Sequence, residues 1–232
     1  MQVLITGATG FLGKSIITRL VDDDRVQKIF VLVRPDSRHT AVERFEKMLC
    51  SIFPQSKQKY AIAKFRVFDG DLKKEGLGLS RESREFLVNN TNQILHIGAS
   101  TDFGAPIDVS RESNVEGTRK ILDFAAQAYN AGVLKRLDYI STAYVAGCKR
   151  GVVFESDLDR QQAFSNNYEK SKFEAELLVR QKAREIPTTI HRPSIVVGDS
   201  VSGFTPHFKV LYWPLKILAK GLLPVFPVNK RA

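Results

Sequence analysis

Apolar and polar residues alternate along this chain in two kinds of segment. Short runs rich in Val, Ile and Leu are separated by longer stretches whose apolar residues recur at helical spacing. This alternation is typical of βαβ units around a parallel sheet. The short runs predict strands at Val3–Thr6, Lys28–Val33, Lys64–Asp69, Gln93–His96, Arg136–Ser141 and Thr188–Arg192. The longer stretches predict helices that begin near Phe11 and cover about Ala41–Ile52, Val109–Ala131 and Gln161–Glu185. We therefore expect an α/β fold with a doubly wound parallel sheet.

The segment Phe208–Val228 has a different texture, because it is apolar and aromatic and contains three prolines. Its length approaches that of a membrane span, but lysines argue against one, since each costs about 2.5–3.5 kcal/mol near the centre of a spanning helix. In a helix, Lys209, Lys216 and Lys220 would form one stripe. The opposite side would carry Phe208, Leu211, Leu215, Leu218 and Leu222. We expect an amphipathic wall of a binding pocket; a core helix, a protein interface and a peripheral membrane contact stay open.

The glycines of Thr6-Gly7-Ala8-Thr9-Gly10-Phe11-Leu12-Gly13 follow the first strand and open the first helix. Gly7 permits a tight turn, Gly10 lets the main chain approach a pyrophosphate, and Gly13 allows close packing of helix on strand. Free N–H groups at the start of a helix attract phosphates. This arrangement predicts a Rossmann fold that binds a nicotinamide cofactor. The expected contacts are Gly7, Thr9, Gly10, Phe11, Leu12 and Gly13.

The end of the second strand indicates which nicotinamide cofactor is bound. NAD sites place an acidic residue there to bond the ribose 2′-hydroxyl. This chain has Arg34, with Arg38 close behind. Arg34 would meet the 2′-phosphate of NADP through charge-assisted hydrogen bonds worth about 1.5–3 kcal/mol. We therefore favour NADPH, while Asp36 nearby keeps NAD open as an alternative.

Two further strand ends contribute candidate cofactor contacts. The third strand is followed by Asp71 and Leu72, of which the carboxylate can accept from an adenine amino group while Leu72 packs on the ring. The fourth strand leads to Gly98 and Ala99, small residues that let the backbone pass close to the cofactor. His96 on that strand is expected to be a packed core histidine.

Candidate catalytic residues lie later in the chain. Tyr168 and Lys172 are four residues apart, so they project from the same face of a helix. A neighbouring ammonium favours the phenolate, so we expect Lys172, with the positive nicotinamide of the oxidised cofactor, to lower the pKa of Tyr168 and make it an acid or base. Thr142 stands at the end of the preceding strand, where its hydroxyl can hold a substrate carbonyl.

Together these motifs, with Asn114-Val115-Glu116-Gly117-Thr118, resemble the extended short-chain dehydrogenase/reductase family. The resemblance implies that Thr142, Tyr168 and Lys172 are catalytic, that Lys172 binds the nicotinamide ribose, and that Asn114 organises the site. Val-Leu-Val-Arg after the second strand and His191-Arg192-Pro193-Ser194 look like the fatty acyl-CoA reductase and thioester-reductase (male-sterility-type) branch. That likeness adds Pro193 to the expected cofactor contacts.

By this resemblance the expected reaction is NADPH-dependent reduction of an acyl thioester, on CoA or on a carrier protein, to an aldehyde or alcohol. An epimerase/dehydratase or a sterol- or flavonol-type dehydrogenase of the same family is the alternative, and a non-catalytic cofactor sensor is a third. We expect residues 1–200 to be the NAD(P)-binding domain and 201–232 to begin a substrate-binding region that stops before it is complete.

Charge and cysteines add little to this picture. The formal charge of +10 suits a phosphorylated ligand, but the basic residues are scattered and no nucleic-acid motif is present, so no nucleic-acid partner is expected. We expect no metal site. Two distant cysteines predict buried free thiols in a reducing compartment. Without a leader ahead of the first strand, we expect a cytoplasmic protein.

Overall fold

The computed structural model describes residues 1–201, 203, 205 and 212–222. In this part of the chain, parallel strands form one sheet in the order β3-β2-β1-β4-β5-β6. The strands are β1 (Gln2–Thr6), β2 (Lys28–Val33), β3 (Phe65–Asp69), β4 (Gln93–His96), β5 (Arg136–Ile140) and β6 (Thr188–His191). The expected strands and the doubly wound parallel sheet are confirmed, and each strand ends within one residue of its predicted bounds.

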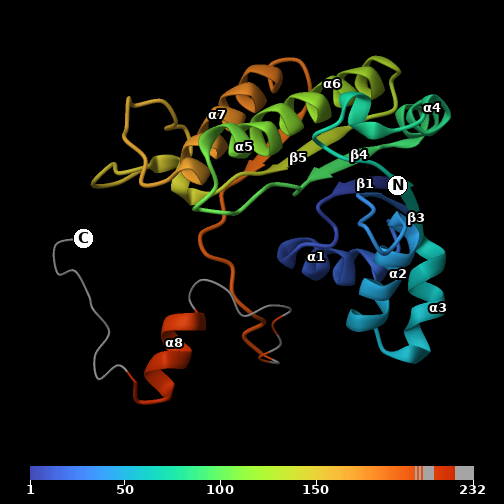
Figure 1. Cartoon of the computed structure of the whole chain (residues 1–232). Helices are drawn as coiled ribbons and strands as arrows, with labels where there is room; N and C mark the ends of the chain where they lie inside the picture. The colour runs from blue at the N-terminus through green and yellow to red at the C-terminus, as the bar shows by residue number, and fades with distance from the viewer. Residues whose placement is uncertain (202, 204, 206–211, 223–232) are drawn as a thin grey trace. The chain divides into compact units, whose positions relative to one another are not determined.

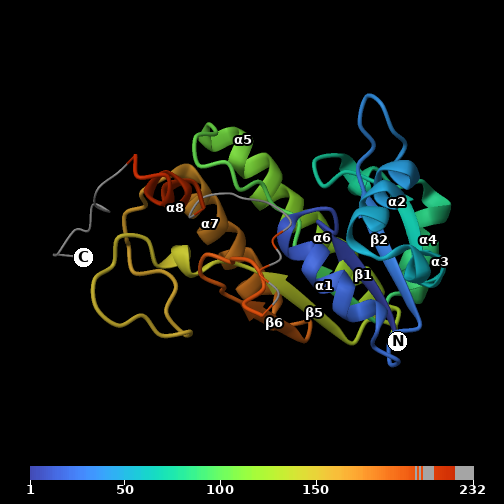
Figure 2. The same ribbon diagram turned by 90° about the horizontal axis from the view of Figure 1, so that it is seen from below.

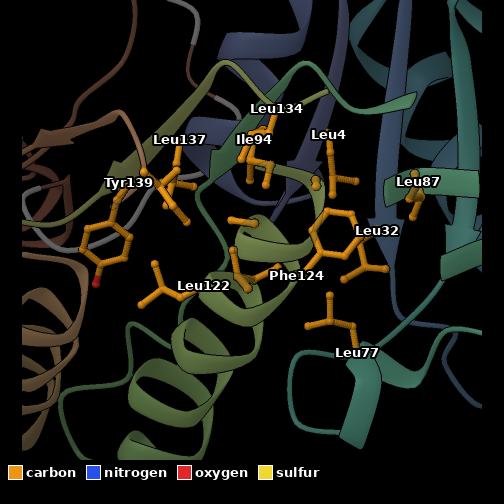
Figure 3. Packing of buried hydrophobic residues seen from close by; sticks show 14 of the residues in the cluster. Leu4, Leu32, Leu77, Leu87, Ile94, Leu122, Phe124, Leu134, Leu137 and Tyr139 are labelled. Atoms are coloured by element: carbon orange, nitrogen blue, oxygen red, sulfur yellow. The ribbon is translucent and has the colours of Figure 1, made fainter. Parts of the chain in front are cut away.

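Helices cover both faces of the sheet (Figure 1). One face carries α1 (Phe11–Val21), α2 (Ala41–Ile52) and α3 (Gln55–Lys64); the other carries α4 (Arg81–Asn90), α5 (Ile107–Arg111), α6 (Gly117–Asn130) and α7 (Asn167–Lys182). Side chains alternate along each strand, so Val3 and Ile5 enter the cluster under α1 while Leu4 enters the cluster under α6. Figure 3 shows Leu4, Ile94 and Phe124 of the second cluster. Burial on both faces explains why the strands read as apolar runs.

Some helices differ from the prediction. The bounds of α2 match it, and a reciprocal capping box between Thr40 and Glu43 fixes its start. The expected helix Val109–Ala131 is present as α5 and α6, joined by a π-helical turn at Glu112–Glu116. The helix expected over Gln161–Glu185 begins later, at Asn167, because the Asn166 side chain caps it by accepting from the Glu169 N–H. The sequence did not predict α3 and α4.

Strands β2 and β3 are added on one side of β1, and β4, β5 and β6 are added on its other side, so the topology switches between β1 and β4. These two neighbours pair in register, with Thr6 opposite His96 at their carboxyl ends. In open α/β sheets, ligands bind outside the carboxyl ends of the strands at this switch point. Figure 2 views the sheet from the side of α1, and both views show the segment between β5 and α7, in yellow, extending beyond the sheet. The fold therefore places the glycine loop after β1 at the expected ligand position.

The chain divides into two compact units, Met1–Ser194 and Ile195–Ala232. The second unit contains α8 (Tyr212–Ala219), which lies within the segment Phe208–Val228 that was expected to be an amphipathic helix. Leu215, Leu218 and Leu222 are exposed. The remaining residues of that prediction, Phe208, Lys209, Leu211 and 223–228, lie outside the described residues. No helix in the described ranges is long and apolar enough to cross a bilayer.

The prediction that both thiols are buried is wrong, because Cys50 and Cys148 are exposed free cysteines. Cys50 lies near the end of α2 and Cys148 lies in the loop after β5, where neither side chain is needed to fill the core. The assignment of residues 1–200 and 201–232 to cofactor and substrate domains stays a prediction.

Candidate active site

The glycine loop is shaped by contacts that exclude side chains. Gly7 has φ +74°, and a Cβ there would lie 2.6 Å from the backbone nitrogen of Gly98. A Cβ on Gly13 would collide with the Gly7 carbonyl oxygen. Both glycines are therefore required for the tight turn and for packing α1 against it.

The helix that follows the loop begins without a side-chain cap. Gly10 is the N-cap of α1 and offers no side-chain acceptor to the first-turn N–H groups. The backbone N–H groups of Phe11, Leu12 and Gly13 thus lack the usual side-chain partner, and Thr9 is half-buried beside them. An uncapped helix start on a glycine turn fits the pyrophosphate of a dinucleotide, so the residues present fit the cofactor expected from the sequence.

At the end of β2, the side chain of Arg34 is 58% exposed, and its guanidinium lies 3.8 Å from the Asp71 carboxylate. The Arg34 carbonyl accepts a hydrogen bond of 2.6 Å from Arg44, on the first turn of α2. Arg44 was not among the residues singled out from the sequence, although the capped helix start at Thr40 places it in the same corner. The structure therefore gathers two arginines where one was expected.

Asp36, the residue that keeps NAD open, is engaged in its own turn. Its carboxylate accepts from the backbone N–H groups of Arg38 and His39, at 2.8 and 2.9 Å. The bond from the Arg38 N–H is the largest of the effects that lower the pKa of Asp36. A carboxylate held this way caps the turn after β2, which reduces its capacity to bond a ribose hydroxyl.

The contacts expected after β3 and β4 lie together. Leu72 packs so closely on Gly98 that a Cβ at position 98 would lie 2.8 Å from the Leu72 Cδ1. Only glycine leaves the space at position 98 that Leu72 occupies, and Ala99 follows it half-buried. Asp71 accepts from the Lys73 N–H at 3.0 Å, so its carboxylate also supports a turn. His96 is a buried core histidine, as expected, and burial lowers its pKa to about 3.

The expected catalytic side chains come together beyond the end of β5. Thr142 is buried two residues after the strand, and its hydroxyl lies near enough to Tyr168 on α7 to affect the pKa of that phenol. Lys172, one turn further along α7, is almost fully buried. The Pro193 carbonyl accepts from the Ala143 N–H at 2.9 Å, which joins the chain after β6 to the Thr142 segment. The sequence motifs, far apart in the chain, therefore share one corner of the fold.

The pKa of Tyr168 differs from its ordinary value in this structure. Burial raises it, and the Thr142 hydroxyl only partly opposes that effect. The Lys172 ammonium instead donates to the Tyr139 hydroxyl and the Ile140 carbonyl, each at 2.8 Å. In the chain without a cofactor, the pKa of Tyr168 is therefore raised, and the lowering expected from Lys172 beside a positive nicotinamide stays a prediction. A raised pKa keeps the phenol protonated at neutral pH, which is the form that donates a proton.

Asn114 clamps the loop after β4 to α7. Its side chain accepts from the Ser100 N–H at 2.7 Å, donates to the Ser100 carbonyl at 3.1 Å, and donates to the Ser171 hydroxyl at 2.9 Å. It lies in the π-helical turn Glu112–Glu116, where the extra residue changes the direction of the side chain. Such turns are frequent at functional sites. Asn114 thus organises the corner that contains Tyr168.

Sequence reasoning missed two further neighbours of this corner. The ring of Phe103 lies 5.3 Å from the ring of Tyr168, centre to centre, and Phe103 is exposed on its other side. Glu176 is fully buried and accepts hydrogen bonds from Arg192, Arg180 and Ser141. The residue types carry no local signal for these pairings, because the partners come from different elements.

Comparison with known proteins identifies relatives. The chain is 29% identical to fatty acyl-CoA reductase wat of Drosophila melanogaster. The alignment is 253 positions long and covers 97% of this chain and 49% of the relative. Fatty acyl-CoA reductase 1 of Mus musculus is 30% identical over 221 residues, 84% of this chain and 43% of the relative. The chain thus spans about half the length of these relatives.

Solved structures give the same result. The terminal R domain from the myxalamid PKS-NRPS biosynthetic pathway is 30% identical with a TM-score of 0.82, over 95% of this chain and 55% of that one. The family model described as male sterility protein, which is an NAD-binding model, matches residues 5–232. The resemblance inferred from the motifs is confirmed. The chain belongs to the male sterility protein family of NAD-binding reductases, of the short-chain dehydrogenase/reductase type.

Proposed function

We propose that this chain is the cofactor-binding part of an NADPH-dependent reductase that converts acyl thioesters to aldehydes. The observation that carries the proposal is the convergence of Thr142, Tyr168 and Lys172 beside the switch point of the sheet. The relatives named as fatty acyl-CoA reductases support an acyl thioester as substrate. A carrier-protein thioester is a second form of the same substrate class, supported by the likeness to an R domain.

The corner after β2 supports NADPH. Arg34 and Arg44 offer two guanidinium groups where the 2′-phosphate of the adenosine ribose would lie. Asp36, which would serve a ribose hydroxyl in an NAD site, is instead occupied by the N–H groups of its own turn. Charge-assisted hydrogen bonds from arginine to phosphate are among the stronger polar contacts in proteins.

The chemistry assigned to the side chains follows from their protonation. The bound nicotinamide supplies the hydride. Thr142 and Tyr168 hold the thioester carbonyl oxygen, and Tyr168, kept protonated by its raised pKa, donates its proton to that oxygen as the carbonyl carbon is reduced. The carbon–sulfur bond of the resulting hemithioacetal then breaks, its hydroxyl proton passes to the sulfur, and the products are the free thiol and an aldehyde. Lys172 bonds the ribose hydroxyls and supports the charge that develops on the phenol.

The direct test is to incubate the protein with NADPH and acyl-CoAs of different chain lengths, with a nucleotide sugar and a sterol ketone as the competing substrates. We expect NADPH oxidation and free thiol in equal amounts with the acyl-CoAs. Tyr168→Phe keeps the ring and removes the proton donor, so turnover should fall by about 10²–10⁴ while NADPH still binds. Turnover of the sugar or sterol alone would reject the thioester assignment.

Cofactor choice is tested separately by titrating NADPH and NADH. Arg34→Ala should weaken NADPH binding at least about tenfold and leave NADH binding unchanged, since only NADPH carries the 2′-phosphate. Equal affinities for the two cofactors in the unmodified chain would reject the assignment. The cytoplasmic location and a carrier-protein partner stay predictions.

A further inference from the structure

The reaction outlined above gives no role to the buried hydroxyl of Tyr139. Tyr139, on β5, is 1% exposed and its ring belongs to the apolar cluster between the sheet and α6. Figure 3 shows it at one end of that cluster, with its hydroxyl directed away from Leu137. A buried hydroxyl is retained at a cost unless it is hydrogen-bonded, so its partners indicate what it does.

The first partner is Lys172. The ammonium donates to the Tyr139 hydroxyl and to the Ile140 carbonyl, each at 2.8 Å, and lies 4.4 Å from the centre of the Tyr139 ring. An ammonium has three protons to donate. Among the hydrogen bonds of the described residues, two are directed to β5, so one proton remains for a ligand. The residues of β5 therefore determine the direction in which that proton points.

The second partner begins a chain of buried polar groups. The Tyr139 hydroxyl lies near the Thr118 side chain on α6, whose hydroxyl lies 3.1 Å from the His96 Nε2. The His96 Nδ1 lies 2.7 Å from the Thr6 hydroxyl, which accepts from the Gly98 N–H at 3.1 Å. These side chains are all buried and come from β1, β4, β5 and α6. Lys172 is thereby tied to the two loops at the switch point.

The linked side chains from Tyr139 to Thr6 are all uncharged. Burial raises the pKa of Tyr139 far above its ordinary range, and burial lowers the pKa of His96 to about 3. A neutral imidazole donates through one nitrogen and accepts through the other, so His96 can bond the Thr6 and Thr118 hydroxyls at the same time. The Tyr139 hydroxyl is therefore a neutral acceptor for the Lys172 ammonium.

We propose that Tyr139 is a positioning residue for Lys172. The Tyr139 hydroxyl and the Ile140 carbonyl keep the buried Lys172 ammonium charged and direct it towards the cofactor ribose and Tyr168. The proposal rests on the proposed function, because Lys172 acts on the cofactor only there.

The electrostatic surroundings explain why such an acceptor is needed. Burial lowers the pKa of Lys172 to about 7, and only Glu176, one turn along α7, opposes this effect appreciably. The other titratable groups facing it are Tyr168 on α7, Tyr139 on β5 and His96 on β4. The Glu176 carboxylate is itself engaged by Arg192 at 2.7 Å. With a pKa of about 7, Lys172 is close to half ionised at neutral pH, so losing one hydrogen-bond acceptor would shift it towards the neutral amine.

The test is Tyr139→Phe, which keeps the ring in the core and removes only the hydroxyl. Its first readout is the Lys172 titration in the cofactor-free chain, followed by the ¹³Cε chemical shift and assigned with Lys172→Arg. A hydrogen bond from a charged donor is strong enough to move a pKa by about one to two units. We expect the pKa of Lys172 to fall by about that amount, since the ammonium loses an acceptor. The pH at which kcat/KM declines on the alkaline side should fall with it.

Two variants complete the design. Tyr129→Phe makes the same change on the exposed face of α6 and should leave both readouts unchanged. Thr118→Val removes the next link and should shift Lys172 in the same direction by less, since Tyr139 keeps its hydroxyl but loses its fixed orientation.

An unchanged Lys172 titration in Tyr139→Phe overturns the proposal, even if the variant is less stable, because a packing role alone does not move that pKa. Failure of the proposed function looks different. In that case the unmodified chain reduces no acyl thioester, yet Lys172 still titrates lower in Tyr139→Phe.

Discussion

Glu176→Gln tests the charge cluster behind the candidate active site. Glu176 is 0% exposed and lies 2.7 Å from Arg192 and 3.0 Å from Arg180, and it accepts from the Ser141 hydroxyl at 2.6 Å. Burial favours the protonated carboxyl, but the bonds from Arg192 and Ser141 outweigh it and lower the pKa of Glu176. Glutamine keeps the shape and one oxygen acceptor and removes the charge, which leaves the partly buried Arg192 without its counter-ion.

Removing one partner of a buried ion pair costs about 3–5 kcal/mol. Because glutamine retains one acceptor, we expect the lower end, about 3 kcal/mol. With a urea dependence of about 2–3 kcal/mol/M, the unfolding midpoint should fall by about 1–1.5 M. The assay is urea unfolding followed by far-UV circular dichroism at neutral pH.

The pH dependence of that difference has a defined sign. The pKa of Glu176 is lower in the folded chain than in the unfolded chain, where it is about 4.3. Its contribution to stability is therefore present above that pH and is lost as pH falls through the folded pKa. The gap between the unmodified chain and Glu176→Gln should narrow on acidification.

A matched control is Glu85→Gln, which removes the charge of an exposed pair with Arg81 at 3.0 Å. An exposed pair is worth less than about 1 kcal/mol, so this variant should unfold close to the unmodified chain. If Glu176→Gln destabilises no more than Glu85→Gln, the cluster is not a structural charge pair and the reasoning is refuted.

Three further predictions follow from other parts of the chain. Gly7→Ala places a Cβ 2.6 Å from the Gly98 nitrogen, at a residue with positive φ. Binding of the nicotinamide cofactor should therefore be lost, while circular dichroism shows a folded chain. Normal NADPH binding would show that the loop is not the cofactor turn. Asp36→Ala should weaken NADPH several-fold by loosening the turn that carries Arg34, without affecting NADH; an equal loss for NADH would instead mean that Asp36 bonds the ribose. Leu215→Asp should weaken long acyl-CoAs far more than acetyl-CoA, since each buried methylene contributes about 0.8 kcal/mol; equal loss across chain lengths would indicate a structural helix.

The sequence predicted the sheet well because each strand is buried on both faces and therefore reads as an apolar run. The sequence did not predict α3 and α4, because few of their residues are buried. In each of these helices a single residue is fully buried, Ala61 in α3 and Leu87 in α4. A face with only one fully buried residue gives no clear helical periodicity in the sequence. The late start of α7 was missed because the cap at Asn166 was not recognised.

Residues of the candidate site divide in a similar way. The glycine loop, Arg34 and the Tyr168–Lys172 pair have local spacing that chemistry requires, so they can be read from the sequence. The partners that set their protonation cannot. Tyr139 meets Lys172 across 33 positions of sequence, and Ser141 meets Glu176 across 35. Such pairs depend on how β5 packs against α7, which no local pattern encodes.

Helix α7 shows what this packing accomplishes. Its buried face contains Glu169, Ser171, Lys172 and Glu176, where an ordinary core helix would carry apolar side chains. Two of these are opposite charges one turn apart, with different surroundings. Arginine partners keep Glu176 ionised, whereas Lys172 has neutral acceptors and a pKa of about 7. Glu176 is therefore a structural charge, whereas Lys172 is the charge that we expect to respond when a cofactor brings new acceptors to it.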